Sequence, residues 1–254
     1  YRTASRLLHN ISNYVDDWLG YANTIDGLLK NFTEFLRVCL ESNITLNTNK
    51  TLFGFPSAEF FGFTADKEGT HLSDKHLDPI ASLVPPTDIP ELRRVLGLYV
   101  VSRRHIQDYA MITAPMTSIL RGRNPEFFWG PAQQAAFDTV RELLLGGIHL
   151  ATPDYDVPFH LATDASEDGK GGMLYQLPSV PLDQQFPYSP RTHAAANLSV
   201  IQFLSKAWND AARNRPPFYV EADALLWGME SAFSTPFRQS FPCTPTATIF
   251  RLLG

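Results

Sequence analysis

The clearest periodicity in the sequence lies in residues 25–41, and it restricts the fold more than any other feature. Apolar residues recur there at intervals of three and four, namely Leu28, Leu29, Phe32, Phe35, Leu36, Cys39 and Leu40. This spacing predicts a helix with one apolar face, and Thr24 is suited to cap its N-terminus. Short strand-like segments follow at 44–46 and 52–64. A helix of this kind next to strands predicts a compact α+β unit in the first part of the chain.

The middle of the chain changes character. Prolines at 79, 85, 86 and 90 mark a linker-like stretch, and helical patterns follow at 89–106, 113–120 and 131–145. Pro131 suits the first position of the last of these helices. Between residues 75 and 125 there are seven Lys or Arg residues against four Asp or Glu residues. We therefore expect a small helical part that is locally basic.

The last third again mixes strands and a helix. Residues 157–166 predict a strand that ends in an acidic turn, and 171–177 predict its hairpin partner. Residues 198–208 predict a third strand and 218–233 an amphipathic helix. Residues 234–254 have no clear period, so we expect that segment to be loosely packed.

Composition limits the function classes. With 254 residues and 44% hydrophobic content the chain can bury a core, and its net charge of −5 argues against a general nucleic-acid binder. Two cysteines, Cys39 and Cys243, are too few and too far apart to indicate a disulfide framework or a zinc site. No signal peptide and no run of 18 apolar residues is present, so we expect an intracellular protein that does not contact a membrane.

Nine short motifs occur in a fixed order along the chain. They read YVDD, LNTNK, FFGF, ELRRVLGL, SRRHI, TAPMTSIL, FFWGPAQQAAFDTVRELL, PFHLATDAS and GGMLYQ. This series resembles the polyprotein of gypsy-type LTR retrotransposons, from the late palm of the reverse transcriptase into the RNase H domain. The resemblance implies a partial palm at 1–72, thumb and connection helices at 73–150, and a partial RNase H-like domain with a degenerate C-terminus at 151–254. Because the sequence does not begin with Met, we expect a fragment of a longer polyprotein.

The resemblance implies a polymerase site around YVDD. Asp16 and Asp17 match the metal-binding catalytic pair, and Tyr14 and Lys50 match residues near the incoming nucleotide. Two-metal nucleotidyl transfer needs divalent ions roughly 4 Å apart, and carboxylate oxygens suit Mg²⁺. An Asp-Asp pair also occurs in ordinary solvated turns, and Lys50 is open to the simpler interpretation of a solvated lysine.

The resemblance also implies contacts with the template–primer. Phe61 and Gly62 fall where the family has its primer-grip hairpin, although the phenylalanines of this segment are as readily explained as core. Four arginines fall on or near helices that lie along the nucleic-acid backbone in this family, namely Arg93, Arg94, Arg103 and Arg104. Phosphate contacts of this type are electrostatic and independent of sequence. For any single arginine, a solvated helix face is an equal alternative.

In the C-terminal part, Asp164 matches the first metal-binding aspartate of RNase H. The register of the following helix places Asp223 at the position of the family's glutamate, with Glu221 two residues earlier. The resemblance thus implies a site of Asp164, Glu221 and Asp223 in which Asp164 and Asp223 hold the metal. Aspartate in place of glutamate at position 223 makes the side chain one methylene shorter, so Glu221 is an alternative metal ligand. We expect the three carboxylates to converge.

The chain departs from the family at both sites. The polymerase needs a third carboxylate from an earlier strand, yet residues 1–13 contain no acid, and neither do residues 234–254, where a later RNase H aspartate is expected. The family function is RNA-directed DNA polymerase and ribonuclease H with Mg²⁺ or Mn²⁺, and we expect this chain to bind the metal weakly and to be inactive. The expected partners are an RNA–DNA hybrid or template–primer and the rest of the polyprotein, in a cytoplasmic particle or the nucleus. The alternatives are a non-catalytic nucleic-acid-binding module and a degenerate retroelement remnant.

Overall fold

The computed structural model describes most of the chain in two compact units. The described residues are 11–14, 17–22, 24–60, 62–66, 69–154, 157–166, 168–178, 198–208, 216–234 and 248–253. Unit 1 comprises residues 1–73, 149–157 and 236–254, and unit 2 comprises residues 74–148 and 158–235. The polypeptide therefore passes repeatedly between the two units.

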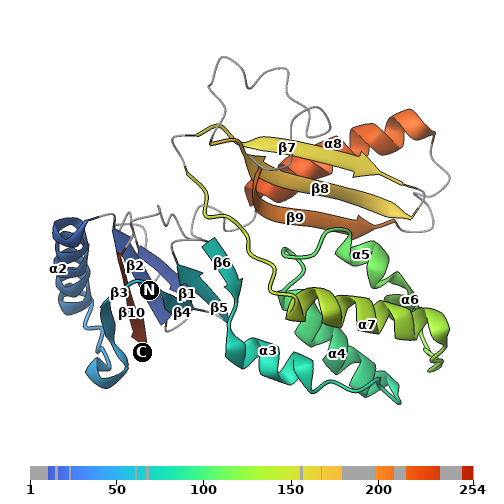
Figure 1. Cartoon of the computed structure of the whole chain (residues 1–254), viewed down its shortest axis with the longest axis horizontal. Coiled ribbons are helices and arrows are strands. Elements are labelled where there is room, and N and C mark those ends of the chain that lie inside the picture. The colour runs from blue at the N-terminus through green and yellow to red at the C-terminus, as the bar shows by residue number, and fades with distance from the viewer. Residues whose placement is uncertain are drawn as a thin grey trace. The chain divides into compact units, whose positions relative to one another are not determined.

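Unit 1 contains two antiparallel sheets and one long helix (Figure 1). The first sheet has the strand order β1-β2-β10-β3, and the second has the order β4-β5-β6. The elements are β1 (Ile11–Tyr14), β2 (Asp17–Ala22), α2 (Ile25–Glu41), the 3-10 turn η1 (Thr48–Lys50), β3 (Leu52–Phe55), β4 (Ala58–Phe60), β5 (Phe63–Asp66), β6 (Gly69–Leu72) and β10 (Thr248–Leu253).

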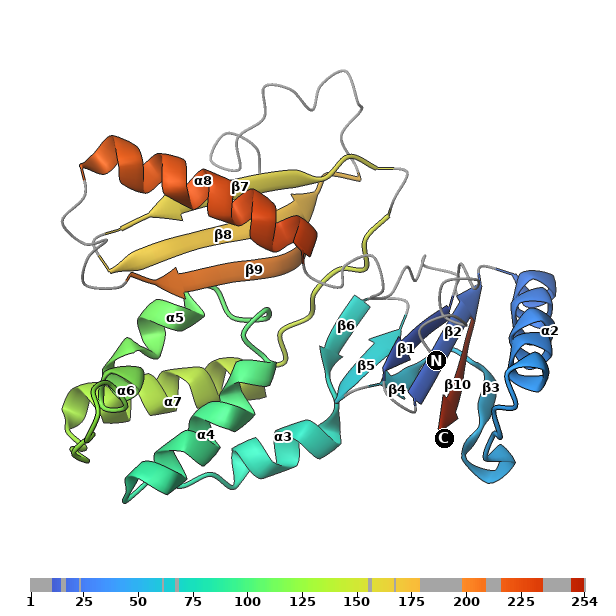
Figure 2. The same cartoon turned by 180° about the vertical axis from the view of Figure 1, so that it is seen from behind.

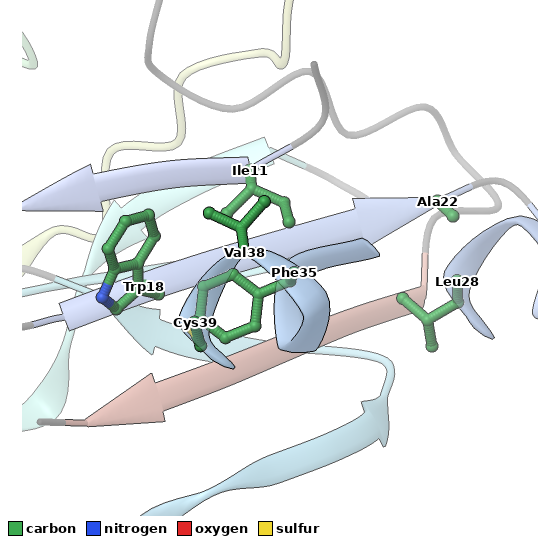
Figure 3. Close-up of a cluster of buried hydrophobic side chains, with 7 residues drawn as sticks. All are labelled: Ile11, Trp18, Ala22, Leu28, Phe35, Val38 and Cys39. Atoms are coloured by element: carbon green, nitrogen blue, oxygen red, sulfur yellow. The ribbon is translucent and has the colours of Figure 1, made fainter. Parts of the chain in front are cut away.

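Helix α2 covers one face of the first sheet, as its apolar stripe predicts. The Thr24 hydroxyl accepts a hydrogen bond from the Gly27 N–H at 3.1 Å, so the predicted N-cap is present. The rings of Trp18 and Phe35 lie 5.1 Å apart at the centre of the interface. The buried cluster consists of Ile11, Trp18, Ala22, Leu28, Phe35, Val38 and Cys39 (Figure 3).

The opposite face of β2 packs on the second sheet. Successive side chains of a strand point to opposite faces, so Leu19 and Tyr21 lie on the other side from Trp18. They form a buried cluster with Ala58, Phe60 and Ala65. Unit 1 is thus built in three layers, with β2 contributing to both interfaces.

Two expectations for unit 1 are wrong. Residues 44–46 form no strand, although Ile44 and Leu46 still pack against the α2 cluster. The C-terminal segment contains strand β10, whose residues pair with both β2 and β3, whereas we expected no regular structure there. Residues 235–247 lie outside the described part.

Unit 2 combines helices with a third antiparallel sheet, of order β7-β8-β9 (Figure 2). Helix α8 lies across one face of that sheet. The elements are α3 (Asp74–Ala81), α4 (Ile89–Val101), α5 (Tyr109–Ile112), α6 (Ala114–Ser118), α7 (Pro131–Leu145), β7 (His160–Ala165), β8 (Gly169–Gln176), β9 (Ser199–Ala207) and α8 (Pro217–Ser234).

The helical part of unit 2 has its own core. Helix α4 begins after Asp88, whose carboxylate accepts a hydrogen bond from the Glu91 N–H at 2.8 Å. Tyr99 of α4 is fully buried, and its hydroxyl donates to the Phe137 carbonyl of α7 at 3.2 Å. Burial raises the pKa of Tyr99 above its ordinary value. The helix predicted at 131–145 is confirmed over its whole length, and the one predicted at 89–106 is confirmed up to Val101. Helix α3 lies where a linker-like stretch was expected to begin.

The units divide the chain differently from the predicted three domains. The first break follows Ser73, one residue from the predicted boundary at 72. Beyond it, the helices of 74–148 and the sheet formed after Pro158 belong to one unit. The assignment of 73–150 and 151–254 as separate domains stays a prediction.

Gly69 provides a test of how unit 1 is held together. It has φ +138°, and a Cβ at this position would lie 2.0 Å from the Leu150 carbonyl oxygen. We expect Gly69→Ala to lower the free energy of unfolding by more than about 2 kcal/mol, because it adds a backbone clash to a strained conformation. Gly54 is a matched control, since it has φ +78° with open space around it, and its alanine variant should cost only about 1 kcal/mol. Equal losses in chemical denaturation would contradict this account of Gly69.

Candidate functional site

The YVDD segment lies at the β1–β2 connection. The two strands pair antiparallel, with Tyr14 opposite Asp17. Asp17 begins β2 and is half-buried, and its other neighbour in the sheet is Leu253 of β10. Asp16 lies outside the described residues. The strand pairing agrees with the expected hairpin, but the geometry of the Asp16–Asp17 pair stays a prediction.

The other residues predicted for the polymerase part lie in two places. Lys50 ends the turn η1 and is exposed. Gly62 lies in the tight turn between β4 and β5 with φ +79°, and Phe61 lies outside the described residues. Phe60, which pairs with Phe63 across this hairpin, is 6% exposed. The hairpin is present, and Phe60 contributes to the core.

Three of the four predicted arginines are exposed in unit 2. Arg93 and Arg94 lie on α4, whose opposite side buries Leu92, Val95 and Tyr99. Arg103 follows in the turn after the helix. The helix therefore presents its apolar side to the core and its guanidinium groups to solvent, an arrangement that suits contact with phosphates.

Arg104 differs from its neighbours because it is half-buried. Its carbonyl oxygen accepts a hydrogen bond from the Phe203 N–H of β9 at 2.9 Å. Burial, and to a smaller extent the charge of Arg103, lowers the pKa of Arg104. A second link lies close by, where the Ala110 N–H donates to the Ser205 hydroxyl at 2.8 Å. The segment that carries Arg103 and Arg104 is thus attached to the edge of the third sheet.

The face of the third sheet under α8 holds a buried cation. Lys170 of β8 has a side chain that is only 6% exposed, and its ammonium group forms an ion pair with the Asp223 carboxylate of α8. The same nitrogen lies 4.9 Å from the ring centroid of Trp208 and 5.1 Å from that of Trp227. Aromatic faces and a carboxylate together stabilise a cation removed from water.

The surrounding elements fix this arrangement. The Trp208 indole N–H donates to the Ser166 carbonyl at 2.8 Å, which orients its ring. Gly228, one residue after Trp227, lets α8 approach β7 closely, because a Cβ there would lie 2.5 Å from the Thr163 methyl carbon. The sheet and helix are therefore in direct contact around Lys170.

Asp164 lies on the other face of this sheet. Thr163 faces α8, so alternation along β7 directs Asp164 away from that helix. Its partner across the sheet is Gly171, and a Cβ on Gly171 would lie 3.0 Å from the Asp108 carboxylate at the start of α5. Asp164 itself is exposed and accepts a hydrogen bond from the Ala165 N–H at 3.0 Å.

The predicted convergence of Asp164, Glu221 and Asp223 is not observed. Within the described ranges, no group of three or more His, Cys, Asp or Glu residues is arranged to hold a metal ion. Asp223 is paired with Lys170, and Glu221 is exposed on α8. Asp164 lies on the face of the third sheet that is turned away from α8. Magnesium requires several converging oxygens, so these residues do not fit the metal that the family resemblance implies.

Sequence reasoning missed Lys170, Trp208 and Trp227. The available signal was a lysine inside a strand pattern, GKGGMLYQ, that is otherwise small and apolar. A buried lysine needs a counter-charge, but the sequence does not show which carboxylate lies above it.

Comparisons with known proteins give a consistent result. Residues 129–184 match the profile of an RNase H-like domain found in reverse transcriptase. The retrovirus-related Pol polyprotein from transposon opus of Drosophila melanogaster is 27% identical over 228 residues, covering 86% of this chain and 21% of that protein. The corresponding protein from transposon gypsy of Drosophila melanogaster is 30% identical over 174 residues, covering 64% of this chain and 17% of that protein. The chain therefore spans about a fifth of the length of these relatives.

The fold also has counterparts among solved structures. A foamy viral protease-reverse transcriptase in complex with RNA/DNA hybrid matches with a TM-score of 0.71 and 17% identity, covering 93% of this chain and 30% of that one. The dRH form of the foamy viral protease-reverse transcriptase, in complex with double-stranded DNA, matches with a TM-score of 0.70 and 18% identity, covering 93% of this chain and 38% of that one. At this level of identity the likeness concerns the fold. None of the described helices is both long and apolar enough to span a bilayer.

The ion pair predicts a specific loss of stability. Asp223→Asn should lower the free energy of unfolding by about 1–2 kcal/mol, because the buried Lys170 ammonium loses its counter-charge. Glu221→Gln removes the same charge from the same helix at an exposed position, so it should change stability by less than about 0.5 kcal/mol. Chemical denaturation of both variants tests this difference, and equal effects would exclude a structural role for the pair.

Proposed function

We propose that this chain is the part of a retroelement reverse transcriptase that holds the template–primer duplex. Its similarity to the retrovirus-related Pol polyproteins of Drosophila transposons supports this proposal. The RNase H-like match at 129–184 and the foamy viral fold support this proposal. We assign residues 1–72 to the late half of the palm, 73–150 to the thumb and connection, and 151–254 to a partial RNase H-like domain.

The observation that carries the proposal is the exposure of Arg93, Arg94 and Arg103 in unit 2. Guanidinium groups attached to a rigid helix can contact successive phosphates without reading the bases. Each such contact releases counterions, which makes the affinity depend on salt. Two related solved structures are complexes with RNA/DNA hybrid and with double-stranded DNA, and the proposed partner of this chain is a duplex of the same kind.

We further propose that the chain has no polymerase or RNase H activity when it acts alone. Asp16 and Asp17 retain the assignment as a pair for Mg²⁺ or Mn²⁺, with Tyr14 and Lys50 near the nucleotide and Phe61 and Gly62 near the primer. Residues 1–13 supply no acid to complete this pair, and the RNase H carboxylates do not form a metal-holding group in the described structure. Binding is therefore the function that these residues support best.

Neutralising the arginines tests the binding role. Arg93→Gln and Arg103→Gln should each weaken binding to primed RNA–DNA duplex, and each should reduce the slope of log K against log salt by about 0.9, because one phosphate contact is lost. Arg37→Gln is a matched control, since Arg37 is an exposed arginine of α2 in unit 1. Fluorescence anisotropy at several salt concentrations measures both quantities. Binding that is insensitive to salt, or equally weakened by Arg37→Gln, would contradict the proposal.

The absence of catalysis is tested separately. Purified protein with Mg²⁺ or Mn²⁺ should neither extend a primer nor cleave the RNA strand of a hybrid, because neither carboxylate set is complete. Gel assays with labelled substrates measure both reactions. Nucleotide incorporation that disappears in Asp16→Asn, or RNA cleavage that disappears in Asp164→Asn, would show the chain to be an enzyme.

A further inference from the structure

We infer that Lys170 takes the place of a metal ion at Asp223, so that the RNase H-like part of this chain is stabilised by its own ammonium group and not by a divalent cation. This inference rests on the RNase H-like assignment within the proposed function. It concerns the ion pair between β8 and α8, which no family resemblance predicted.

The environment of the lysine is built for a single positive charge. The Lys170 side chain is 6% exposed, with one carboxylate and two indole rings around the nitrogen. Trp208 is fixed by its hydrogen bond to Ser166, and Trp227 is carried by the helix that supplies Asp223. Cation–π contacts gain strength when the cation is removed from water, so the ammonium is stabilised from several sides.

Among the residues that the structure describes, a divalent ion at Asp223 lacks the ligands that it needs. Mg²⁺ and Mn²⁺ prefer several oxygen ligands, and the indole rings next to this carboxylate offer none. Glu221 lies two positions earlier on the helix, a spacing at which side chains do not face each other. Asp164 lies on the face of the sheet that is turned away from α8.

Binding of a metal ion would also have to displace the lysine. An ion at Asp223 would stand next to the Lys170 ammonium, and two like charges in a partly buried site repel strongly. Moving the ammonium away would separate it from the Asp223 carboxylate while its strand stays packed against α8. The existing pair is therefore favoured over a metal complex.

Manganese provides the probe for the test. We expect titrations of the full chain with Mn²⁺, followed by electron paramagnetic resonance of the free ion, to give the same curve for the wild-type protein, Asp223→Asn and Glu221→Gln. Any weak site at Asp16 and Asp17 is unchanged among these three proteins. A bound Mn²⁺ that is lost in Asp223→Asn but kept in Glu221→Gln would overturn the inference.

A double-mutant cycle gives an independent readout. Lys170→Met replaces the ammonium with an unbranched apolar side chain that is one atom shorter. We expect the variant Lys170→Met with Asp223→Asn to melt at a higher temperature than Asp223→Asn alone, because the unpaired buried ammonium has been removed. If the melting-temperature shifts of Lys170→Met and Asp223→Asn simply add in the double variant, a direct interaction between the two residues is contradicted. These experiments contain no nucleic acid, so a failure of duplex binding leaves their outcome intact.

Discussion

Unit 1 depends on a single strand that is buried on both faces. Strand β2 places Trp18 against α2 and Leu19 and Tyr21 against the second sheet. Because side chains alternate, a shift of one residue in its register would exchange the two sets and disrupt both interfaces. The pairing of Tyr14 with Asp17 belongs to that register. Asp17 is thus positioned by packing that lies further along the same strand.

Unit 2 depends on contacts between its helices and one edge of its sheet. The hydrogen bonds from Phe203 to Arg104 and from Ala110 to Ser205 attach the segment after α4 to β9. The exposed arginines therefore stand on a segment connected to the RNase H-like sheet. The position of this segment within unit 2 therefore depends partly on that sheet.

The sequence predicted the local elements well and the long-range contacts poorly. Helix α2 was predictable because its cap and its apolar stripe lie within one segment, and the strands β7 and β8 followed from a local alternation. Strand β10 was missed because its partners, β2 and β3, lie near the other end of the chain. The Lys170–Asp223 pair was missed for the same reason, since the family pattern suggests a metal ligand where the fold supplies an internal ammonium. Motif order predicted the resemblance to retrotransposon Pol polyproteins, which the comparisons support, but it did not show how the carboxylates are used.

The backbone contact between Thr70 and Leu150, next to Gly69, affects which sequence changes the chain tolerates. The Thr70 N–H donates to the Leu150 carbonyl at 2.8 Å, and the Leu150 N–H donates back to the Thr70 carbonyl at 2.9 Å. The polypeptide thus leaves unit 1 after Ser73 and returns at His149, next to the strand from which it departed. Residues 74–148, which belong to unit 2, are thus inserted between two segments that pair with each other in unit 1. Sequence changes within residues 74–148 are therefore limited mainly by the core of unit 2, whereas a methyl group added at residue 69 acts directly on the strand pairing of unit 1.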